Sequence, residues 1–545
     1  MMRRTDALAA AGEEFDVCII GGGATGAGCA LDAQLRGLKT LLVEANDFAS
    51  VTSSASTKLI HGGIRYLREA ALHFDPGQVG VVKRALQERV YMLHNAPFLA
   101  GAMEFIIPCY SRWESAYFGA GVKLYDLLAG KANLLPSRRL TRDQALQRMP
   151  TLKSDGLVGA VTYSDGQFDD AGYNLALVRT FAELGGVALN HARVMALERK
   201  PGEGLHSAQI QDEISRRTFE IRARAFVNAT GPASDAIRRM ANPKATPRLK
   251  LSKGAHILLP LQQFGSGDAM LIPETSDGRV IFAIPWMGRL LVGTTDDPVN
   301  EFGDVSLSDE DVGYLLHHLN QFVQKPLVTE QIIGGFAGIR PLISADSRST
   351  KSLSRDHKVE VDEQTGLISI LGGKWTTYRA MAEDTIDAVQ RYLRQSVREC
   401  STRNHPLSGS VGSTTTLCEE LARTYRTSPE TARHLVGKLG TNAVRVLELA
   451  AAAPELAEPI VDGFPAIRAE IVYSIRNDMA MSIEDILARR IGLQFYSWKL
   501  AAQAAPVVAQ YLAREYGWSD ERRQHAVDEY VGKLRRMLQT AGLGN

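Results

Sequence analysis

A glycine-rich turn near the start of the chain is the first stretch whose residue types and spacing could do chemistry. The turn consists of Gly21, Gly22, Gly23, Ala24, Thr25 and Gly26. Gly21 would permit a tight turn, Gly23 would let the backbone approach a pyrophosphate, and Gly26 would let a helix pack closely on a strand. Glu44 follows at the distance where a carboxylate accepts hydrogen bonds from a ribose diol and repels a 2′-phosphate. The pattern therefore predicts a dinucleotide site and argues against NADP.

A polar stretch follows the glycine turn and could also contact phosphate oxygens. Its hydroxyls and its lysine include Thr52, Ser53, Ser54, Ser56 and Lys58. A polar loop with a helix cap is the plainer interpretation of the same residues. That interpretation is weaker at His61, because the adjoining Gly62 and Gly63 would bring the backbone close to a flat or bulky group.

A third set of residues, with catalytic or anion-binding side chains, lies close to glycines along the chain. It comprises His61, Arg65, Tyr66, Lys253, His256, Arg340, Arg355 and Lys374. Several arginines and lysines that converge on one site would suit a doubly charged phosphate, because guanidinium groups match its oxygens. The sequence gives His256 two equally good interpretations: a buried structural histidine, or the base that removes a hydroxyl proton during oxidation.

The elements around the glycine turn form a predicted βαβ unit. Residues 17–20 are a short apolar run typical of a buried parallel strand, residues 27–35 favour a helix that ends at Gly37, and residues 41–43 predict a second strand. The helix N-terminus would offer free N–H groups to phosphates. A later predicted strand leads into a short turn that accompanies the first one in flavin proteins and so favours FAD over NAD. This turn consists of Ala229, Thr230 and Gly231.

The remaining segments predict two further kinds of structure. Residues 158–163 favour a strand that ends in a turn at Asp165 and Gly166. Residues 249–292 alternate short apolar runs with turn residues, which predicts antiparallel hairpins suited to covering a substrate. From about residue 400 only helix signals occur, which indicates an all-helical packing or docking domain.

The composition narrows the class of protein. The 545 residues are 45% hydrophobic and 23% charged, and the net charge of +1 gives no field that would recruit nucleic acid. The five cysteines contain no C-x-x-C pair, so neither a zinc site nor a redox dithiol is indicated, and their odd number fits a reducing compartment. Residues 1–14 indicate a loose leader without a signal peptide. The chain has no apolar stretch of 18 residues, so a membrane contact would be peripheral.

Together these motifs resemble FAD-dependent glycerol-3-phosphate dehydrogenase. The resemblance runs from about residue 15 to 395, and the helical tail also fits it. It implies an α/β protein in which a Rossmann-like, doubly wound FAD-binding domain is combined with an antiparallel substrate domain, as in D-amino-acid oxidase, and an all-α C-terminal domain. The expected FAD-binding domain is residues 15–80, 156–240 and 345–395. The expected substrate-binding domain is residues 81–155 and 241–344, followed by the helical domain at 400–545.

The resemblance also implies a reaction and its residues. sn-Glycerol 3-phosphate would give a hydride from C2 to FAD while a base takes the hydroxyl proton, which yields dihydroxyacetone phosphate. His256 is the expected base, with His61 and Arg340 as competitors. Arg340 and Arg355 would hold substrate and phosphate, with Arg65, Tyr66 and Lys374 beside them. The expected cofactor contacts are those of the two turns, Glu44 and the polar stretch, together with Leu59, His61, Gly62, Gly63, Gly338, Gly373, Lys374 and Thr376.

The expected partners follow from the same resemblance. Electrons would pass to a membrane quinone, so the protein would sit in the cytoplasm against the cytoplasmic face of the inner membrane. A homodimer is one expected assembly, and no metal is expected. Three alternatives remain open: an oxidase that uses oxygen, an amine or amino-acid oxidase on the same fold, and a flavin-binding module without catalysis. The several basic residues beside glycine turns argue against the last two.

Overall fold

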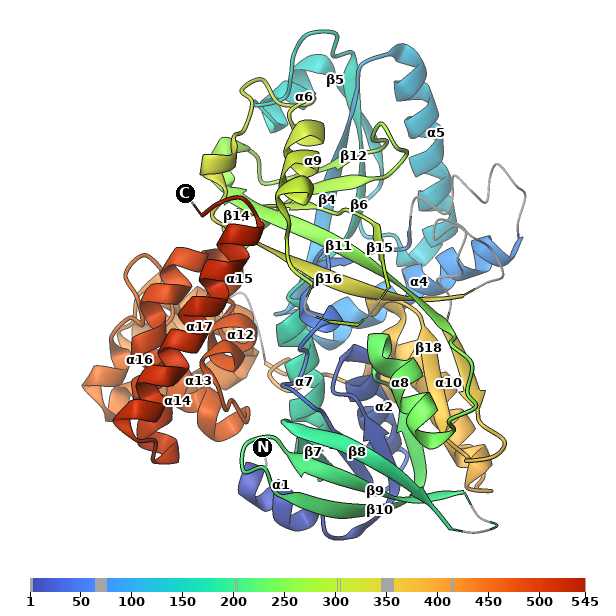
Figure 1. Cartoon of the computed structure of the whole chain (residues 1–545). Coiled ribbons are helices and arrows are strands. Elements are labelled where there is room, and N and C mark those ends of the chain that lie inside the picture. The colour runs from blue at the N-terminus through green and yellow to red at the C-terminus, as the bar shows by residue number, and fades with distance from the viewer. Residues whose placement is uncertain are drawn as a thin grey trace.

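Two mixed β-sheets and a helical domain make up the protein (Figure 1). The computed structural model describes residues 3–544 except 64–75, 201, 203, 301, 304, 345–356 and 413–415. The first sheet, with its helices, forms the lower half in Figure 1, and the second sheet forms the upper half. The predicted α/β class with an all-α C-terminal domain is confirmed.

The first sheet has a parallel centre, in which β1 pairs with β2 and β10, β2 with β7, and β10 with β18. Three antiparallel strands, β17, β9 and β8, complete it. Six strands follow one another across the sheet in the order β17 (His357–Val361), β18 (Ile368–Gly372), β10 (Thr218–Asn228), β1 (Glu14–Ile20), β2 (Thr40–Val43) and β7 (Val187–Leu189). Off this path, β9 (Leu205–Asp212) pairs with β10, and β8 (Ala192–Arg199) pairs with β9.

Helices cover this sheet because its parallel strands are apolar on both faces. The predicted βαβ unit is confirmed as β1, α2 and β2, and α2 carries small residues that let its neighbours approach closely. A Cβ on Gly28 of α2 would lie 2.8 Å from the ring of Tyr378, which begins α10. The helices of this half are α1 (Arg4–Ala10), α2 (Ala24–Leu35), α4 (Pro76–Asn95), α7 (Asp170–Glu183), α8 (Ser234–Ala241) and α10 (Tyr378–Tyr392).

The second sheet is antiparallel except where β12 runs parallel to β4. The hairpins predicted over residues 249–292 are confirmed as β11 to β14. Eight strands follow one another across the sheet in the order β15 (Asp297–Val299), β11 (Leu249–Pro260), β14 (Arg289–Gly293), β13 (Ile281–Trp286), β12 (Ala269–Ile272), β4 (Ala100–Cys109), β6 (Gly159–Phe168) and β3 (Leu59–Ile60). Off this path, β16 (Gly334–Ile343) pairs with β11, and β5 (Arg138–Thr141) pairs with β6. Its helices are α5 (Arg112–Ala129), α6 (Arg142–Arg148) and α9 (Asp309–Leu319).

Strand β6 corrects two predictions. It pairs with β4 along its whole length, so these residues belong to the second sheet and not to the FAD-binding segment that was expected to begin at residue 156. It also continues through Asp165 and Gly166, where a turn was expected. The Asp165 carboxylate is buried and accepts hydrogen bonds from Arg89 (2.6 Å) and Tyr125 (2.8 Å), which lets an aspartate sit inside a strand.

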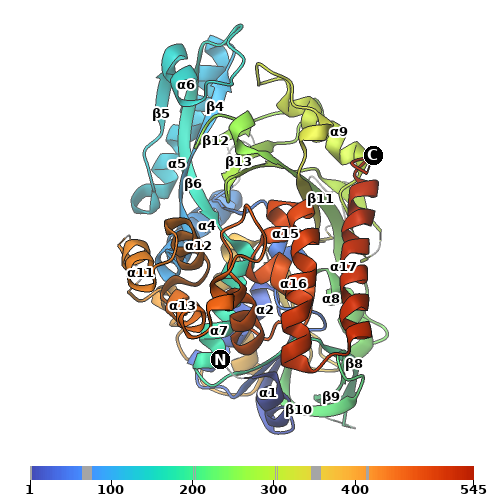
Figure 2. The same ribbon diagram turned by 90° about the vertical axis from the view of Figure 1, so that its left-hand side faces the viewer.

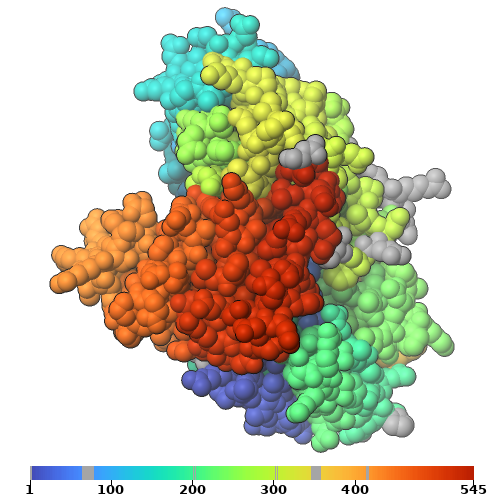
Figure 3. All heavy atoms as spheres, turned by 60° about the vertical axis from the view of Figure 1, so that its left-hand side comes forward, coloured from blue at the N-terminus to red at the C-terminus, as the bar shows by residue number. Residues whose placement is uncertain are grey.

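The C-terminal domain is helical, as expected, and lies across the junction of the two halves (Figures 2 and 3). It shares one apolar core with the second sheet, in which Ile257 of β11 and Trp498 of α16 are both buried. It meets the first half through ion pairs such as Arg179 to Asp478 (2.6 Å) and Lys438 to Asp169 (2.6 Å). Its helices are α11 (Leu417–Tyr425), α12 (Pro429–Leu439), α13 (Ala443–Ala452), α14 (Arg468–Asn477), the π-helix η11 (Asp485–Arg490), α15 (Leu493–Tyr496), α16 (Trp498–Tyr516) and α17 (Asp520–Thr540).

Short 3₁₀ helices mark several connections, and three of them, η1, η3 and η7, lie beside the site described below. They are η1 (Thr52–Ser54), η2 (Gly130–Ala132), η3 (Gly231–Ala233), η4 (Leu261–Gln263), η5 (Thr329–Gln331), η7 (Trp375–Thr377), η8 (Thr402–Asn404), η9 (Gly440–Asn442) and η10 (Pro454–Ala457).

The N-terminal segment is not the loose leader that was expected, since it forms α1. The Arg4 side chain anchors this helix through an ion pair with Asp212 (2.7 Å) and a hydrogen bond to the Asn190 carbonyl (3.1 Å). Within the described part of the chain, no helix is both long enough and apolar enough to cross a membrane.

Candidate active site

An elongated cavity lies where the parallel strands of the first sheet end, which is the usual ligand position in such sheets. Residues that follow the ends of β1, β2, β10 and β18 all contribute to its wall. The lining includes Gly21, Gly23, Ala24, Thr25, Glu44, Thr52, Ser53, Ala192, Arg193, Val194, Ala229, Thr230, Gly231, Phe302, Gly372, Gly373, Lys374 and Trp375. The cavity therefore brings together members of both predicted turns, Glu44 and two residues of the polar stretch.

The glycine turn has the geometry that the sequence predicted. Gly21 has φ +109°, which side-chain-bearing residues rarely adopt, and a Cβ on Gly26 would lie 1.7 Å from the Gly21 carbonyl oxygen. Helix α2 starts at the cavity with Gly23 as its N-cap, a residue that has no side chain to cap the helix. Ser53 from the polar stretch accepts a hydrogen bond from the Ala24 N–H (2.9 Å). The turn thus offers backbone donors and a helix N-terminus to an anion.

Glu44 lies at the end of β2 and faces the same cavity. Its two carboxylate oxygens accept hydrogen bonds from the backbone N–H groups of Gly22 (2.7 Å) and Asn46 (2.8 Å). Burial raises the pKa of Glu44, and these two donors oppose that shift. The carboxylate is thus fixed in place as an acceptor for a ribose diol.

The donor set of the cavity fits FAD. Backbone N–H groups at the start of α2 suit a pyrophosphate, and Glu44 suits a ribose. At Gly372 and Gly373 the wall carries no side chains, and both have positive φ (+69° and +83°), so a flat ring system could lie against the backbone there. Trp375 supports this end through its indole N–H, which donates to the Ser53 carbonyl (2.9 Å).

The second sheet presents its own polar residues on one face of β11 and β16. In register, Gly254 of β11 lies opposite Gly338 of β16, Ser252 opposite Arg340, and His256 opposite Phe336. Because side chains alternate along a strand, the paired residues share one face. A Cβ on Gly338 would lie 2.7 Å from the Ala55 carbonyl oxygen, so the segment that begins at Thr52 lies directly on this face.

His256 is held tightly on that face. Its ring stacks on Phe336, with the ring centres 4.7 Å apart, and its Nε2 lies 3.0 Å from the Thr57 Oγ1. The side chain is 1% exposed, and its Nδ1 has no hydrogen-bond partner among the described residues. Burial, and then the positive charges of Arg340 and Lys58, lower the pKa of His256 well below its ordinary value. The ring is therefore neutral at neutral pH.

Arg340 is fixed by the loop that follows β14. Its Nη1 donates to the Asp296 carboxylate (3.0 Å) and the Thr295 carbonyl (3.1 Å), and its Nη2 donates to the Thr294 hydroxyl (2.7 Å). The side chain is 26% exposed. This arrangement suits an arginine that meets a ligand in a fixed orientation.

The two groups of residues meet along residues 52–63. Thr52 and Ser53 line the cavity, Thr57 contacts His256, and the His61 N–H donates to Thr376 Oγ1 (3.2 Å), next to the cavity residues of η7. Residues 62 and 63 then turn away beneath α5, since the Gly62 N–H donates to the Tyr125 hydroxyl (2.9 Å). One segment therefore connects the dinucleotide cavity to the face that carries the predicted base.

The structure corrects the phosphate role expected for Lys58. Its Nζ donates to Asp170 Oδ1 and to the Ser54 carbonyl, both at 2.6 Å, and both side chains of the ion pair are buried. Ser56 donates to the other oxygen of Asp170 (2.7 Å). Three aromatic rings surround the lysine at 4.7–5.2 Å: Trp286, Phe336 and Phe495. These groups are engaged in holding the segment in place.

Two other residues of the polar stretch lie away from the cavity wall. Ser54 is buried and supplies its carbonyl to Lys58, and Leu59 belongs to an apolar cluster with Phe105 and Tyr163. Arg65, Tyr66 and Arg355 lie outside the described residues, so their expected substrate contacts stay predictions.

Sequence reasoning missed several residues of the site. Asp296 and Thr57 had no role assigned, although an acid or a hydroxyl could have suggested a partner for an arginine or a histidine. The cavity wall at residues 192–194 had no sequence signal, because it depends on how β7 and β8 are joined.

Comparison with known proteins decides the family. A model described as FAD dependent oxidoreductase matches residues 16–383, and a model described as the C-terminal domain of alpha-glycerophosphate oxidase matches residues 400–523. Mouse mitochondrial glycerol-3-phosphate dehydrogenase is 38% identical over 527 residues, which cover 94% of this chain and 72% of that protein. The chain belongs to the FAD-dependent glycerol-3-phosphate dehydrogenase family.

Comparison with solved structures supports the assignment to the glycerol-3-phosphate dehydrogenase family. The enzyme from Bacillus halodurans, solved with FAD, matches with a TM-score of 0.81 and 30% identity over 98% of this chain and 97% of that one. The L-alpha-glycerophosphate oxidase of Mycoplasma pneumoniae matches with a TM-score of 0.54 at 18% identity over 72% of this chain and 98% of that one, which shows a shared fold. The predicted family and FAD as its cofactor are therefore confirmed, and the chain is an FAD-dependent oxidoreductase.

Proposed function

We propose that this glycerol-3-phosphate dehydrogenase oxidises the C2 hydroxyl of sn-glycerol 3-phosphate to the ketone of dihydroxyacetone phosphate. The observation that supports this most directly is that residues 52–63 join the FAD cavity to the face with His256 and Arg340. The relatives named above support the substrate. FAD, when bound, supplies the acceptor for the hydride that leaves C2.

The chain's own residues handle the proton and the charge. His256 is neutral, so a ring nitrogen can take the hydroxyl proton as the hydride leaves. Arg340, oriented by Asp296, binds the substrate through charge-assisted hydrogen bonds. Lys374 lines the cavity beside the glycine wall and orients the glycerol hydroxyls or the cofactor. Arg65, Tyr66 and Arg355 complete the phosphate site, and His61 and Arg340 are the competing candidates for the base.

The acceptor of the electrons is a membrane quinone in this proposal, and α5 supplies a surface for the membrane. Apolar residues recur along one exposed side of this helix at the spacing of successive turns. Trp113 and Leu127 are 74% and 77% exposed. The stripe consists of Trp113, Tyr117, Ala120, Leu124 and Leu127.

The charges around the stripe favour an anionic membrane. Arg112, Lys123 and Lys131 are exposed beside it. The acids of the same helix are engaged within the protein, because Glu114 caps the helix and Asp126 accepts from Ser137 (2.6 Å). In Figures 1 and 2, α5 lies at the outer edge of the molecule. An apolar stripe flanked by basic residues is typical of a helix that lies in a membrane interface, here the cytoplasmic face of the inner membrane.

The substrate is tested by adding sn-glycerol 3-phosphate to the yellow holoprotein without oxygen. The visible flavin band should bleach while dihydroxyacetone phosphate forms in equal amount. A flavin that stays oxidised with this substrate, but is bleached by dithionite, would contradict the substrate. Bleaching by amines or amino acids would then identify the rival oxidase class.

Oxygen is the second candidate acceptor, because the C-terminal family model is described from an oxidase. Reoxidation of the reduced flavin should be fast with a short-chain quinone and slow with oxygen. Rapid reoxidation in air with stoichiometric hydrogen peroxide would favour the oxidase instead.

The membrane contact is tested by sedimentation with vesicles. The protein should bind vesicles that contain phosphatidylglycerol more strongly than vesicles of phosphatidylcholine alone, and L127S should weaken binding. L184S is a matched control, since Leu184 is also exposed (41%) but lies at the end of α7. Equal binding by all three proteins would contradict a role for α5.

A further inference from the structure

Two loops lie at one end of the FAD cavity, and backbone hydrogen bonds connect them. Residues 44–53 form the first loop, and most of them line the cavity; the second loop, residues 190–191, joins β7 to β8 and leads into residues 192–194, which also line the cavity. The Ala192 N–H donates to the Glu44 carbonyl (2.8 Å), and the His191 N–H donates to the Asn46 carbonyl (2.6 Å). The shape of this end therefore depends on both loops together.

Asp47 is the residue of the first loop that the C-terminal domain holds. Its side chain is fully buried, away from the cavity lining. Arg489 Nε donates to Asp47 Oδ2 (2.5 Å), and Arg490 donates through Nη2 to Oδ1 (2.9 Å) and through Nη1 to Oδ2. Asn190 adds a fourth hydrogen bond, to Oδ1 (3.0 Å). We call Asp47, Arg489 and Arg490 the clamp.

The helix that carries the two arginines has an unusual geometry that makes the clamp possible. Residues 485–490 form a π-helix, η11. Consecutive side chains on an α-helix point in different directions, so both would not normally reach one carboxylate. Here Arg489 and Arg490 both reach Asp47, and their side chains are only 7% and 2% exposed. Single-turn π-helices of this kind occur frequently at functional sites.

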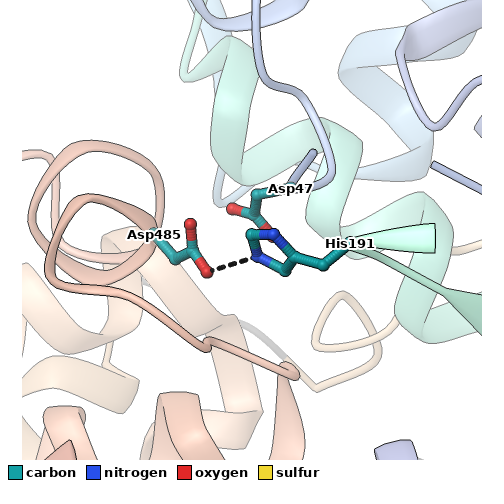
Figure 4. Close-up of side chains that lie close together, drawn as sticks. All are labelled: Asp47, His191 and Asp485. Atoms are coloured by element: carbon teal, nitrogen blue, oxygen red, sulfur yellow. Dashed lines mark hydrogen bonds and ion pairs between the residues drawn. The ribbon is translucent and has the colours of Figure 1, made fainter. Parts of the chain in front are cut away.

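The second loop is held by the same C-terminal segment. His191 Nε2 lies 2.9 Å from Asp485 Oδ2 (Figure 4), and Asn190 also donates to the Met479 carbonyl (2.8 Å). The ligand atoms of Asp47, His191 and Asp485 lie within 4.8 Å of one another, as in a metal site. However, the clamp arginines already place two positive charges on these carboxylates, so the cluster acts as an ionic contact between domains.

The first loop needs such support because part of its backbone is strained. Ala49 has φ +63° and Val51 has φ +80°, a region that favours glycine and is costly for a β-branched residue. Conformations of this kind persist only where surrounding contacts determine them. In this loop those contacts are the Ala49 N–H to the Gly22 carbonyl (3.1 Å) and the clamp on Asp47.

We propose that Arg489 and Arg490 are positioning residues for the cofactor: by clamping Asp47 they hold residues 44–53 in the shape that binds FAD. The C-terminal domain thus contributes to FAD affinity without touching the cavity. This role rests on FAD binding and is independent of the substrate and of the electron acceptor.

The test compares two identical substitutions in the same domain. R490K keeps the charge but loses the fork that reaches both oxygens of Asp47. R476K is the matched control, because Arg476 makes a similar two-bond contact with Glu515 (3.0 and 2.6 Å) on the surface. FAD is titrated into the full-length apoprotein and followed by flavin fluorescence. R490K should raise the Kd for FAD about tenfold, or ~1.4 kcal/mol, while R476K stays near the unmodified protein.

A second readout separates positioning from general stability. At a fixed concentration, a ligand that binds the folded state more tightly stabilises it more, so the FAD-induced rise in Tm measures binding independently. In R490K this rise should shrink at a fixed FAD concentration. If R490K lowers the Tm of the apoprotein and the holoprotein equally and leaves the Kd unchanged, the clamp is structural only and the proposal is wrong. If R490K does not fold, D47N is titrated in its place, and an unchanged Kd there overturns the proposal.

Discussion

The Thr57 hydroxyl lies 3.0 Å from His256 Nε2, and this contact ties the predicted base to the segment that lines the FAD cavity. Thr57 belongs to residues 52–63, whose first members line the FAD cavity, whereas His256 belongs to β11 of the second sheet. Together with the hydrogen bond from the Thr52 hydroxyl to the Ile339 carbonyl of β16 (2.6 Å), this contact links the cofactor cavity to the face that carries the predicted base.

The variant H256N should retain FAD but lose most of its reaction with substrate. A positioned general base contributes about 10²- to 10⁴-fold to a rate, so anaerobic flavin reduction by sn-glycerol 3-phosphate should slow by that range. T57S, which keeps the hydroxyl beside the ring, is the control and should react at nearly the original rate. Normal flavin reduction in H256N would show that another residue is the base.

The pH dependence of flavin reduction should reflect the lowered pKa of His256. The neutral ring is the form that accepts a proton, and burial, then Arg340 and Lys58, favour that form. The rate should therefore hold steady as the pH falls to 6.5, the ordinary value for histidine, and decline only below it. A stopped-flow pH profile measures this, and a decline centred at or above 6.5 would contradict the assignment.

Replacement of Arg340 by lysine should weaken the reaction with the phosphorylated substrate. Lysine keeps a positive charge but cannot reproduce a fork held by Asp296 and Thr294. Hydrogen bonds to charged groups are worth about 1.5–3 kcal/mol, so kcat/KM should fall about 10- to 100-fold. Glycerol serves as the comparison substrate. An equal loss with glycerol would place Arg340 away from the phosphate.

Replacement of Lys58 by methionine should destabilise the protein. The change leaves the buried Asp170 carboxylate without its counter-ion, which costs about 3–5 kcal/mol of unfolding free energy. K358M, which breaks an exposed pair with Glu360, should cost less than about 1 kcal/mol. Denaturant unfolding at a fixed FAD concentration measures both. A large loss of FAD affinity with unchanged stability would restore the phosphate role for Lys58.

The contact between the two loops and the C-terminal segment should weaken as the pH rises. Burial opposes the charge on His191, but Asp485 and then Asp47 outweigh it and raise the pKa of His191 above 6.5; Arg489 acts in the opposite direction. Because the folded form binds the proton more tightly, the stabilisation is complete below pH 6.5 and is lost as the pH rises through the raised value.

The variant H191N isolates this effect. The hydrogen bond from Arg4 to the carbonyl of residue 191 and the bonds from Arg490 to Asp47 do not involve the imidazole, so the variant removes the titrating group and leaves these contacts in place. The Tm of the unmodified protein should fall more steeply above pH 6.5 than the Tm of H191N. Identical slopes in the two proteins would show that His191 does not titrate in this range.

Local patterns made the cofactor site predictable. The glycine turn, the strand before it and Glu44 lie within one βαβ unit, where spacing in sequence fixes spacing in the fold. Helix starts are equally local: Ser428 and Ser519, which precede Pro429 and Asp520, cap their helices.

Long-range partners explain what the sequence could not show. Lys58 was predicted to bind phosphate because its neighbours in sequence offer no counter-ion; its true counter-ion, Asp170, lies over a hundred residues away. Asp165 resembled a turn residue because Arg89 and Tyr125, which satisfy it, come from other elements. No local sequence pattern predicts such long-range pairs.

The clamp also orders events in the making of the protein. Asp47 and Arg490 are 443 positions apart, so the loop beside the glycine turn meets its partner only when almost the whole chain has been synthesised. Domains generally fold from the N-terminus during translation. Here, however, one wall of the nucleotide site cannot make its stabilising contacts until η11 has been synthesised. Stable flavin uptake should therefore follow the synthesis of residues 485–490, and retention of FAD by nascent chains stalled before residue 478 would contradict that order.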